Sequence, residues 1–373
     1  MNTDTDSVIS FSTGTGHDRP LTPSSWADLE ADSYEWINDK GSVCHGPETD
    51  VDSVDFDTQS HTSISPSVHN YEHQHDRRYH GYKRGRYPLP NDAHEQNLDE
   101  LKHYIMMELA DGQLFMSDLD VIPTKVIDVG TGTGSWAIDL ADKYPNSYIV
   151  GTDLSPIQPS ALPPNCHMFV DDCEEEDWGF DDDFDLVHFR NMAWTLYNLN
   201  EMLNKAYTNL NPGGWVEFQE FLPQIFCDDD TMKADDPLQA FAQISADGMR
   251  KLGYRSFGSQ DLVESLKNSG FTDVQCVTKK VPIGAWTADQ KLKYLGGLMR
   301  TVVEESLSAY LAKPFAAMGI SPDERNGLVS SVKSSLQDQR IHRYVKVQFC
   351  YGQKPEDEDE YGTTFDGSPS REI

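Results

Sequence analysis

The sequence predicts an α/β fold in which a mostly parallel sheet is covered by helices on both faces. Two observations predict it. Short apolar segments alternate with longer segments of helical periodicity, and a turn with three glycines, Gly130, Gly132 and Gly134, follows the first apolar segment. Strands that alternate with helices form parallel sheets, because each helix carries the chain back to the same edge. A glycine-rich turn after the first strand is typical of folds that bind nucleotides.

The elements of the first half follow from periodicity. Apolar residues recur at helical spacing from Leu98 to Leu109, and either Asn91 or Asp92 can cap the N-terminus of this helix. The elements that follow are a strand over 125–129, a helix over 134–144, and strands over 147–153, 166–172 and 184–189. Each strand is a short apolar run bounded by polar or glycine residues, as buried parallel strands are.

The second half adds more helices than a minimal fold needs. A helix over 199–210 is expected to end at the turn-forming residues Asn211 to Gly214. The later elements are a strand over 215–221, helical segments near 237–252 and 259–269, a strand over 273–283, helical segments over 287–312 and 321–338, and a last strand over 342–354. We expect a late strand to return antiparallel at the sheet edge. Residues 287–338 are therefore a helical insert. We expect it to cover that edge, to close over a substrate or to mediate pairing of two copies of the chain.

Charge divides the chain into three parts. Residues 1–76 hold fifteen acidic and two basic residues, and residues 355–373 hold seven acidic residues and one basic residue. Segments this acidic and polar cannot bury a core, so both are expected to be disordered tails. The intervening residues 77–354 carry a net charge of −13 and are expected to form the folded domain. An acidic body repels nucleic-acid phosphates, so a nucleic-acid substrate is not expected.

Composition excludes further classes of protein. No apolar run approaches the roughly 18 residues of a membrane span, and the N-terminus lacks the features of a secretion signal. The six cysteines are scattered, with no CxxC pair, so neither a disulfide framework nor a zinc site is expected. A cytoplasmic or nuclear protein without a bound metal fits this composition. The basic run "RRYHGYKRGR", residues 77–86, is interpreted as a solvated entry into the domain, or as a nuclear-import signal or partner contact.

The glycine turn has two interpretations. Residues 132–137 satisfy G-x-G-x-x-A, the dinucleotide fingerprint, which leaves an NAD(P)-dependent oxidoreductase open. Residues 128–134 equally satisfy acid-x-G-x-G-x-G, in which Asp128 precedes the first glycine by two positions. A carboxylate beside a pyrophosphate is electrostatically unfavourable, whereas beside a cofactor with a cationic amino-acid part it is favourable. Asp128 therefore favours S-adenosylmethionine over a dinucleotide.

Carboxylates follow the next two strands. Asp153, at the tip of the second strand, is expected to accept hydrogen bonds from the ribose hydroxyls. Asp172, which ends the third strand, is expected to accept the adenine amino proton, with Asp171 as the alternative because strand alternation turns only one of them to the cleft. The first three strand ends would then bind the amino-acid part, sugar and base of the cofactor in turn.

Several motifs together resemble a known family. They are "YHGYKRGRYPLPND", "VIDVGTGTGSWAIDLADKYP", "GTDLSPIQP", "PPNCHMFVDD", "FDLVHFR", "NPGGWVEFQEF" and "RIHRYVKVQFCYGQKP". Between roughly residues 79 and 354 the sequence resembles the fungal LaeA-like (TAM-domain) class I methyltransferases. The resemblance implies a seven-stranded Rossmann-like fold and S-adenosylmethionine as cofactor. It further implies methyl transfer to a small-molecule or protein acceptor, or alternatively a nuclear regulator of secondary metabolism that acts through velvet-type partners.

The resemblance also suggests the site residues. Those expected to contact the cofactor are Asp128, Gly130, Thr131, Gly132, Gly134, Asp153, Leu154, Asp171, Asp172 and Arg190. A general base is needed only if the acceptor must lose a proton before methyl transfer. The candidates for such a base are His103, His188, Glu217 and Glu220, each of which has a purely structural alternative. Trp136 on the first helix after the glycines is expected to serve packing.

Overall fold

The computed structural model describes residues 66–74, 76–119, 121–175, 178–180, 183–255 and 259–356. The chain divides into two units, Met1–His61 and Thr62–Ile373, and all described residues belong to the second. Most of both predicted tails, residues 1–65 and 357–373, lies outside the described residues. In the described part, no helix is long and apolar enough to cross a membrane. That part also contains no group of three or more His, Cys, Asp or Glu residues that could hold a metal ion.

Seven strands form one sheet in the order β5-β4-β3-β6-β7-β9-β8, which confirms the predicted seven-stranded sheet. They are β3 (Lys125–Val129), β4 (Tyr148–Asp153), β5 (Cys166–Val170), β6 (Phe184–Arg190), β7 (Leu210–Phe221), β8 (Thr272–Pro282) and β9 (Tyr344–Gln353). Strands β3 to β7 pair in parallel, and β9 pairs antiparallel with both β7 and β8. The late antiparallel strand thus lies between β7 and β8 rather than at the edge, which β8 forms instead.

Helices cover both faces of this sheet, as alternation along the strands requires. The helices are α2 (Ala93–Leu109), α3 (Ser135–Lys143), α4 (Leu199–Asn209), α5 (Pro237–Lys251), α6 (Ser259–Asn268), α7 (Gln290–Leu311), α8 (Lys313–Met318) and α9 (Pro322–Leu336). Val187 of β6 packs in a core with α4 and α6, whereas its neighbour Leu186 packs in another with α3. Successive residues of one strand point to opposite faces, so each face has its own helices.

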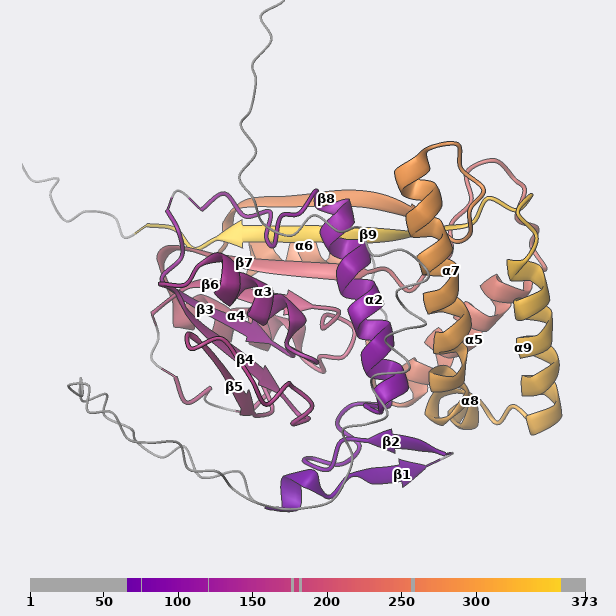
Figure 1. Ribbon diagram of the computed structural model, residues 1–373, viewed down its shortest axis with the longest axis horizontal. Coiled ribbons are helices and arrows are strands. Elements are labelled where there is room, and N and C mark those ends of the chain that lie inside the picture. The colour runs from indigo at the N-terminus through magenta and orange to yellow at the C-terminus, as the bar shows by residue number, and fades with distance from the viewer. Residues whose placement is uncertain are drawn as a thin grey trace, which may run out of the picture. The chain divides into compact units, whose positions relative to one another are not determined.

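A third core joins the predicted insert to the rest of the domain. Residues of α2, α5, α7, α8 and α9 pack together with the adjoining ends of β8 and β9. Figure 1 shows α2 and α7 side by side, with α5, α8 and α9 beyond them. The insert lies between β8 and β9 as expected, but its first segment is two helices, α7 and α8. The helix is interrupted at Ala312, between α7 and α8. Pro314 lies in the first turn of α8, where proline is tolerated.

Two boundaries differ from the predictions. Strand β7 begins at Leu210, because Leu210 already pairs with Phe184. The turn residues that follow Leu210 form a register shift before the next pair, Leu186 with Trp215. Before α2, a helical turn η1 (Pro66–His69) precedes a hairpin of β1 (Glu72–Gln74) and β2 (Arg77–Tyr79). The expected domain boundary between residues 76 and 77 therefore falls inside a hairpin, and folded structure begins at least as early as Pro66.

The structure contains a disulfide between Cys276 and Cys350, contrary to the prediction. These residues lie directly opposite each other on the antiparallel strands β8 and β9, with Cα atoms 4.0 Å apart. They are 74 positions apart in the sequence, so only the strand register brings them together. Cys166, Cys173 and Cys227 are free thiols.

Candidate functional site

A cavity of about 150 Å³ lies at the carboxyl ends of the central parallel strands. One wall is the glycine loop, residues 128–134, together with the residues that follow β4, β5 and β6. The opposite wall consists of α2 and the segment before it, residues 79–91, which we call the strap. The predicted cofactor residues that line the cavity are Asp128, Gly130, Thr131, Gly132, Asp153, Leu154, Asp171, Asp172 and Arg190. Gly134 is the one predicted cofactor residue that is not part of the lining.

The glycines of the loop exclude side chains for different reasons. Gly130 and Gly132 have φ angles of 73° and 59°, a left-handed conformation that favours glycine. A Cβ atom at Gly130 would overlap the thioether of Met192, whereas one at Gly132 would meet no atom within 4 Å. Gly130 is therefore approached by the protein itself, and Gly132 faces open space in the cavity. Gly134 is the N-cap of α3.

Asp128 is held by two hydrogen bonds at the end of β3. Its Oδ2 accepts a hydrogen bond of 2.6 Å from the Thr131 hydroxyl, and its Oδ1 lies 2.7 Å from Nδ1 of His188. His188 is fully buried and stacks on Trp136, with ring centroids 3.6 Å apart. Burial lowers the pKa of His188 despite the bond to Asp128, so the neutral ring donates its Nδ1–H to the carboxylate. His188 orients Asp128 and does not itself line the cavity.

Asp153 ties the end of β4 to the glycine loop. Its Oδ2 accepts from the Gly132 amide at 3.0 Å, and its Oδ1 accepts from the Ser155 amide at 2.8 Å. Each carboxylate oxygen retains a lone pair for a further donor. Burial raises the pKa of Asp153 to about 7, although the two amide donors oppose this shift. The carboxyl group therefore titrates near neutral pH.

Both Asp171 and Asp172 line the cavity, which corrects the expectation that only one of them would. Strand β5 ends at Val170, so neither residue follows the alternation of a strand. Asp172 forms an ion pair of 3.4 Å with Nε of Arg86 and accepts from the Glu174 amide at 3.2 Å. Burial raises the pKa of Asp171.

Arg190, at the end of β6, brings a half-buried positive charge to the cavity. Its Nε and Nη2 donate to the side-chain oxygen of Gln219 at 3.1 and 2.6 Å, and its Nη1 lies 2.6 Å from Nδ1 of His103. Burial lowers the pKa of Arg190 to about 10, which leaves it charged at neutral pH. These hydrogen-bond partners are neutral when His103 accepts at Nδ1. The guanidinium is therefore available to an anionic group of a ligand.

The four candidate bases present no free acceptor atom to the cavity. His103 lines it, but its second ring nitrogen lies 3.0 Å from Asp139, so both nitrogens have partners. Glu217 is fully buried and accepts hydrogen bonds from Met116, Ser117 and Gln219. His188 and Glu220 are fully buried outside the lining. We therefore expect these residues to position other groups rather than to remove a proton.

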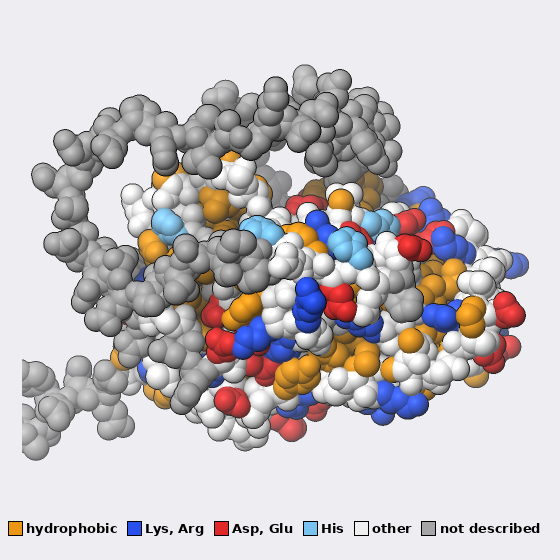
Figure 2. All heavy atoms as spheres, turned by 90° about the horizontal axis from the view of Figure 1, so that it is seen from below, with side chains coloured by type: hydrophobic (Ala, Val, Ile, Leu, Met, Phe, Trp, Pro, Cys, Tyr) orange, Lys and Arg blue, Asp and Glu red, His pale blue; other side chains and the backbone are white. Residues whose placement is uncertain are grey.

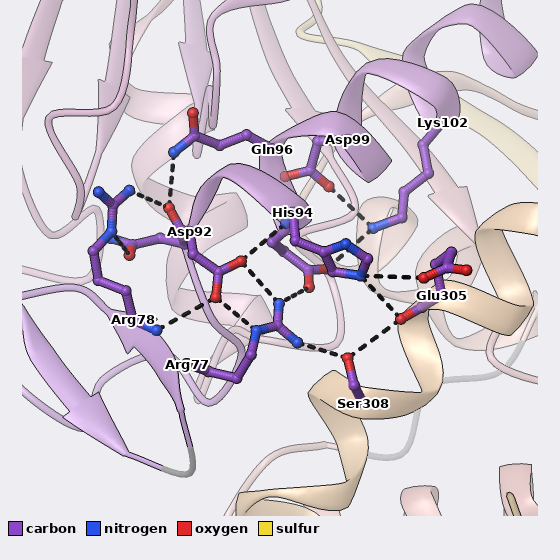
Figure 3. Close-up of polar contacts among 11 residues, drawn as sticks. Arg77, Arg78, Asp92, His94, Gln96, Asp99, Lys102, Glu305 and Ser308 are labelled. Atoms are coloured by element: carbon purple, nitrogen blue, oxygen red, sulfur yellow. Dashed lines mark hydrogen bonds and ion pairs between the residues drawn. The ribbon is translucent and has the colours of Figure 1, made fainter. Parts of the chain in front are cut away.

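The strap makes contacts that the sequence did not predict. Arg86 donates to the Thr195 carbonyl at 3.1 Å, pairs with Glu174 and lies 4.4 Å over the Tyr197 ring. At the other end of the basic run, Arg77 donates to Asp92, the N-cap of α2, at 2.6 Å and to Ser308 of α7 at 2.8 Å (Figure 3). The run is thus tied to the domain rather than solvated. On the face shown in Figure 2, basic side chains are interspersed with acidic ones. The run itself was the only sequence signal for these contacts.

Comparison with known proteins identifies the family. A family model described as a methyltransferase domain matches residues 101–276. The chain is 35% identical over 311 residues to methyltransferase pytC of Aspergillus terreus, which covers 83% of this chain and 96% of that protein. It is 31% identical over 287 residues to the secondary metabolism regulator LAE1 of Cochliobolus heterostrophus, with 74% and 93% covered. The chain belongs to the LaeA-like class I methyltransferases.

A further LaeA-like relative is named for its acceptor. The protein-methionine methyltransferase laeA of Emericella nidulans is 28% identical over 304 residues, which covers 79% of this chain and 80% of that protein. As a LaeA-like methyltransferase, the present protein uses S-adenosylmethionine and transfers its methyl group to an acceptor. The family thereby decides between the two interpretations of the glycine turn. The cavity suits this cofactor, because it combines open space at Gly132 with carboxylates and the guanidinium groups of Arg86 and Arg190.

Proposed function

We propose that S-adenosylmethionine binds in this cavity, with its methionine part beside Gly132, its ribose on Asp153 and its adenine beside Asp171 and Asp172. The observation that carries the proposal is the open space at Gly132, which lines the cavity together with Asp128 and Asp153. Asp153 supports the ribose assignment, because both its oxygens keep a lone pair after accepting from the loop amides.

We assign the charged ends of the methionine part to two residues. Asp128 suits the ammonium group, since His188 and Thr131 orient its carboxylate toward the loop. Arg190 suits the carboxylate group, because its guanidinium has only neutral hydrogen-bond partners. Charge-assisted hydrogen bonds of this kind are stronger than neutral ones.

We further propose that the acceptor atom attacks without first losing a proton, as a thioether sulfur does. When bound, S-adenosylmethionine supplies a methyl group on a positively charged sulfur. Transfer of that methyl group leaves this sulfur neutral and the acceptor atom positively charged. An acceptor such as a methionine side chain therefore needs alignment and exclusion of water rather than a base. The occupied nitrogens of His103 support this choice, as does the name of the relative from Emericella nidulans. A methionine acceptor can belong to a small molecule or to a protein.

Calorimetric titration of the full chain with S-adenosylmethionine, S-adenosylhomocysteine and NAD tests the binding proposal. We expect the first two ligands to bind at micromolar concentration and NAD not to bind. Binding of NAD alone, or of none of the three, would contradict the assigned cavity.

Transfer of a radioactive methyl group to N-acetylmethionine amide tests the acceptor proposal separately. We expect incorporation there to exceed that into matched alcohol and carboxylic acid probes. Higher incorporation into either of those would assign the acceptor to another class.

A second role, as a regulator of secondary metabolism, is supported by the name of the relative from Cochliobolus heterostrophus. Velvet-type partners and a nuclear or cytoplasmic location stay predictions from the sequence. Variants that lose cofactor binding distinguish the two roles. If they keep the cellular role of the wild type, the protein acts through its partners. If they lose it, methyl transfer is required. Imaging of the tagged chain determines the compartment.

A further inference from the structure

The loop that follows β6 is fixed to the next strand by one carboxyl group. Oε1 of Glu220, on β7, accepts from the backbone amides of Met192 and Ala193, each at 3.0 Å. Asn191, with a φ of 55°, adds two bonds, since its amide donates to the Gln219 carbonyl and its Oδ1 accepts from the Phe221 amide. Without Glu220, the buried amide of Ala193 and the part-buried amide of Met192 would lose their acceptor.

This loop in turn shapes the cavity. Asn191 and Met192 both line it, and the thioether of Met192 occupies the space that a side chain at Gly130 would need. The loop after β6 therefore covers one side of the glycine loop, at the point where β6 ends beside β3. Through the two amides, the position of Glu220 determines how Met192 lies against Gly130.

We propose that Glu220 is a positioning residue, which holds Asn191 to Ala193 against the glycine loop and so shapes the cavity wall beside the transferred methyl group. The inference rests on the proposed cofactor placement, because it takes the methionine part to lie beside Gly132, on the same loop as Gly130. It replaces the role of general base considered for Glu220 with one that acts through the backbone of a neighbouring loop.

The surroundings of Glu220 indicate that it works as a neutral acid. The side chain is fully buried, and its Oε2 has no hydrogen-bond partner. Gln348 lies directly opposite on β9, and its Oε1 is also buried without a partner. Side chains of directly paired residues lie on the same face of a sheet, so a proton on Glu220 would supply the donor that this buried pair of acceptors lacks.

The pKa of Glu220 agrees with this arrangement. Burial raises it to about 8, the amides of Met192 and Ala193 oppose the shift, and no charged group of a neighbouring element contributes to it. Because the pKa is raised on folding, Glu220 favours the folded, closed loop at low pH. This contribution is lost as pH rises through about 8. Above that pH a buried charge without a counterion would disfavour the closed loop.

The test is calorimetric titration of S-adenosylmethionine into full-length wild type, Glu220→Gln and Glu220→Ala at pH 7 and pH 9.5. Glutamine keeps an oxygen for the two amides and offers Gln348 a donor, so we expect its Kd to stay within about threefold of wild type at pH 7. We expect Glu220→Ala to bind about tenfold more weakly, because the loop loses its anchor. The ratio of the wild-type Kd to the Glu220→Gln Kd should rise about tenfold between the two pH values.

Comparison with Glu220→Gln cancels titration of the ligand and of Asp153, which both proteins share. Glu264→Gln, the same change at an exposed position of α6, should follow wild type at both pH values. A constant ratio across pH, or Glu220→Gln as weak as Glu220→Ala, would overturn the inference. Failure of wild type to bind at pH 7 would instead contradict the proposed function.

Thermal melting of Glu220→Ala shows whether it is folded. Asn191→Gly, which removes the side-chain bond to the Phe221 amide and keeps the backbone bond to Gln219, should weaken binding without changing the pH-dependent ratio.

Discussion

The two walls of the cavity are built on different principles. The glycine loop is a local structure, because its shape follows from positive φ angles within a few residues and from carboxylates at adjacent strand ends. The strap is held from a distance, since Arg86 contacts residues that follow β5 and β6, and Arg77, on β2 just before the strap, contacts α2 and α7. The first wall can be recognised in a short stretch of sequence, and the second only in the folded chain. The two walls should therefore respond differently to substitution.

The largest effect is expected in the local wall. Gly132→Asp should abolish S-adenosylmethionine binding, a loss of more than about a thousandfold in Kd or about 4 kcal/mol. Aspartate at this φ angle strains the loop, and its side chain enters the open space assigned to the methionine part. Calorimetric titration measures the loss. Gly327→Asp, at an exposed glycine of α9 that also has open space around it, is the matched control and should bind normally.

The next effect belongs to the strap. Arg86→Ala should lower the free energy of unfolding by about 3 kcal/mol, because Asp172 and Glu174 would keep largely buried charges without their partner. Binding should weaken as well, since Arg86 lines the cavity. Urea denaturation and titration measure the two losses. Arg84→Ala, which removes an exposed arginine with one bond to the Asn70 carbonyl, should change stability by less than about 0.5 kcal/mol. Equal losses in the two variants would show that the strap has no such anchor.

The same contrast explains what the sequence could predict. The helix cap at Asp92, the strands and the carboxylates at 128, 153, 171 and 172 were predictable, because each depends on neighbours within a few positions. The disulfide and the roles of Arg86, Glu217 and Glu220 were not. Each depends on a strand register or a loop contact between residues more than 25 positions apart. Only the assembled sheet shows that Glu217 and Glu220 serve backbone amides.

A smaller effect is expected at Asp153, where the local wall meets β4. Asp153→Ala should weaken S-adenosylmethionine binding by about 1.5–3 kcal/mol, the contribution of hydrogen bonds to a charged group. Because burial raises the pKa of Asp153 to about 7, the wild-type carboxyl group becomes charged between pH 6 and pH 8. Wild-type affinity should therefore rise over this range, whereas that of Asp153→Asn should not. Equal pH dependence in the two proteins would assign the ribose to another group.

The smallest effect is expected at the exposed side of the strap. Lys83 pairs with Glu175, but the two side chains are 40% and 42% exposed, so water and salt screen the pair. Lys83→Ala should therefore lower the free energy of unfolding by no more than about 1 kcal/mol and leave the Kd for S-adenosylmethionine unchanged. Urea denaturation at low and high salt checks this, because the wild-type advantage should shrink as salt rises. A loss as large as that of Arg86→Ala would mean that the whole basic run, rather than its buried arginines, holds the strap in place.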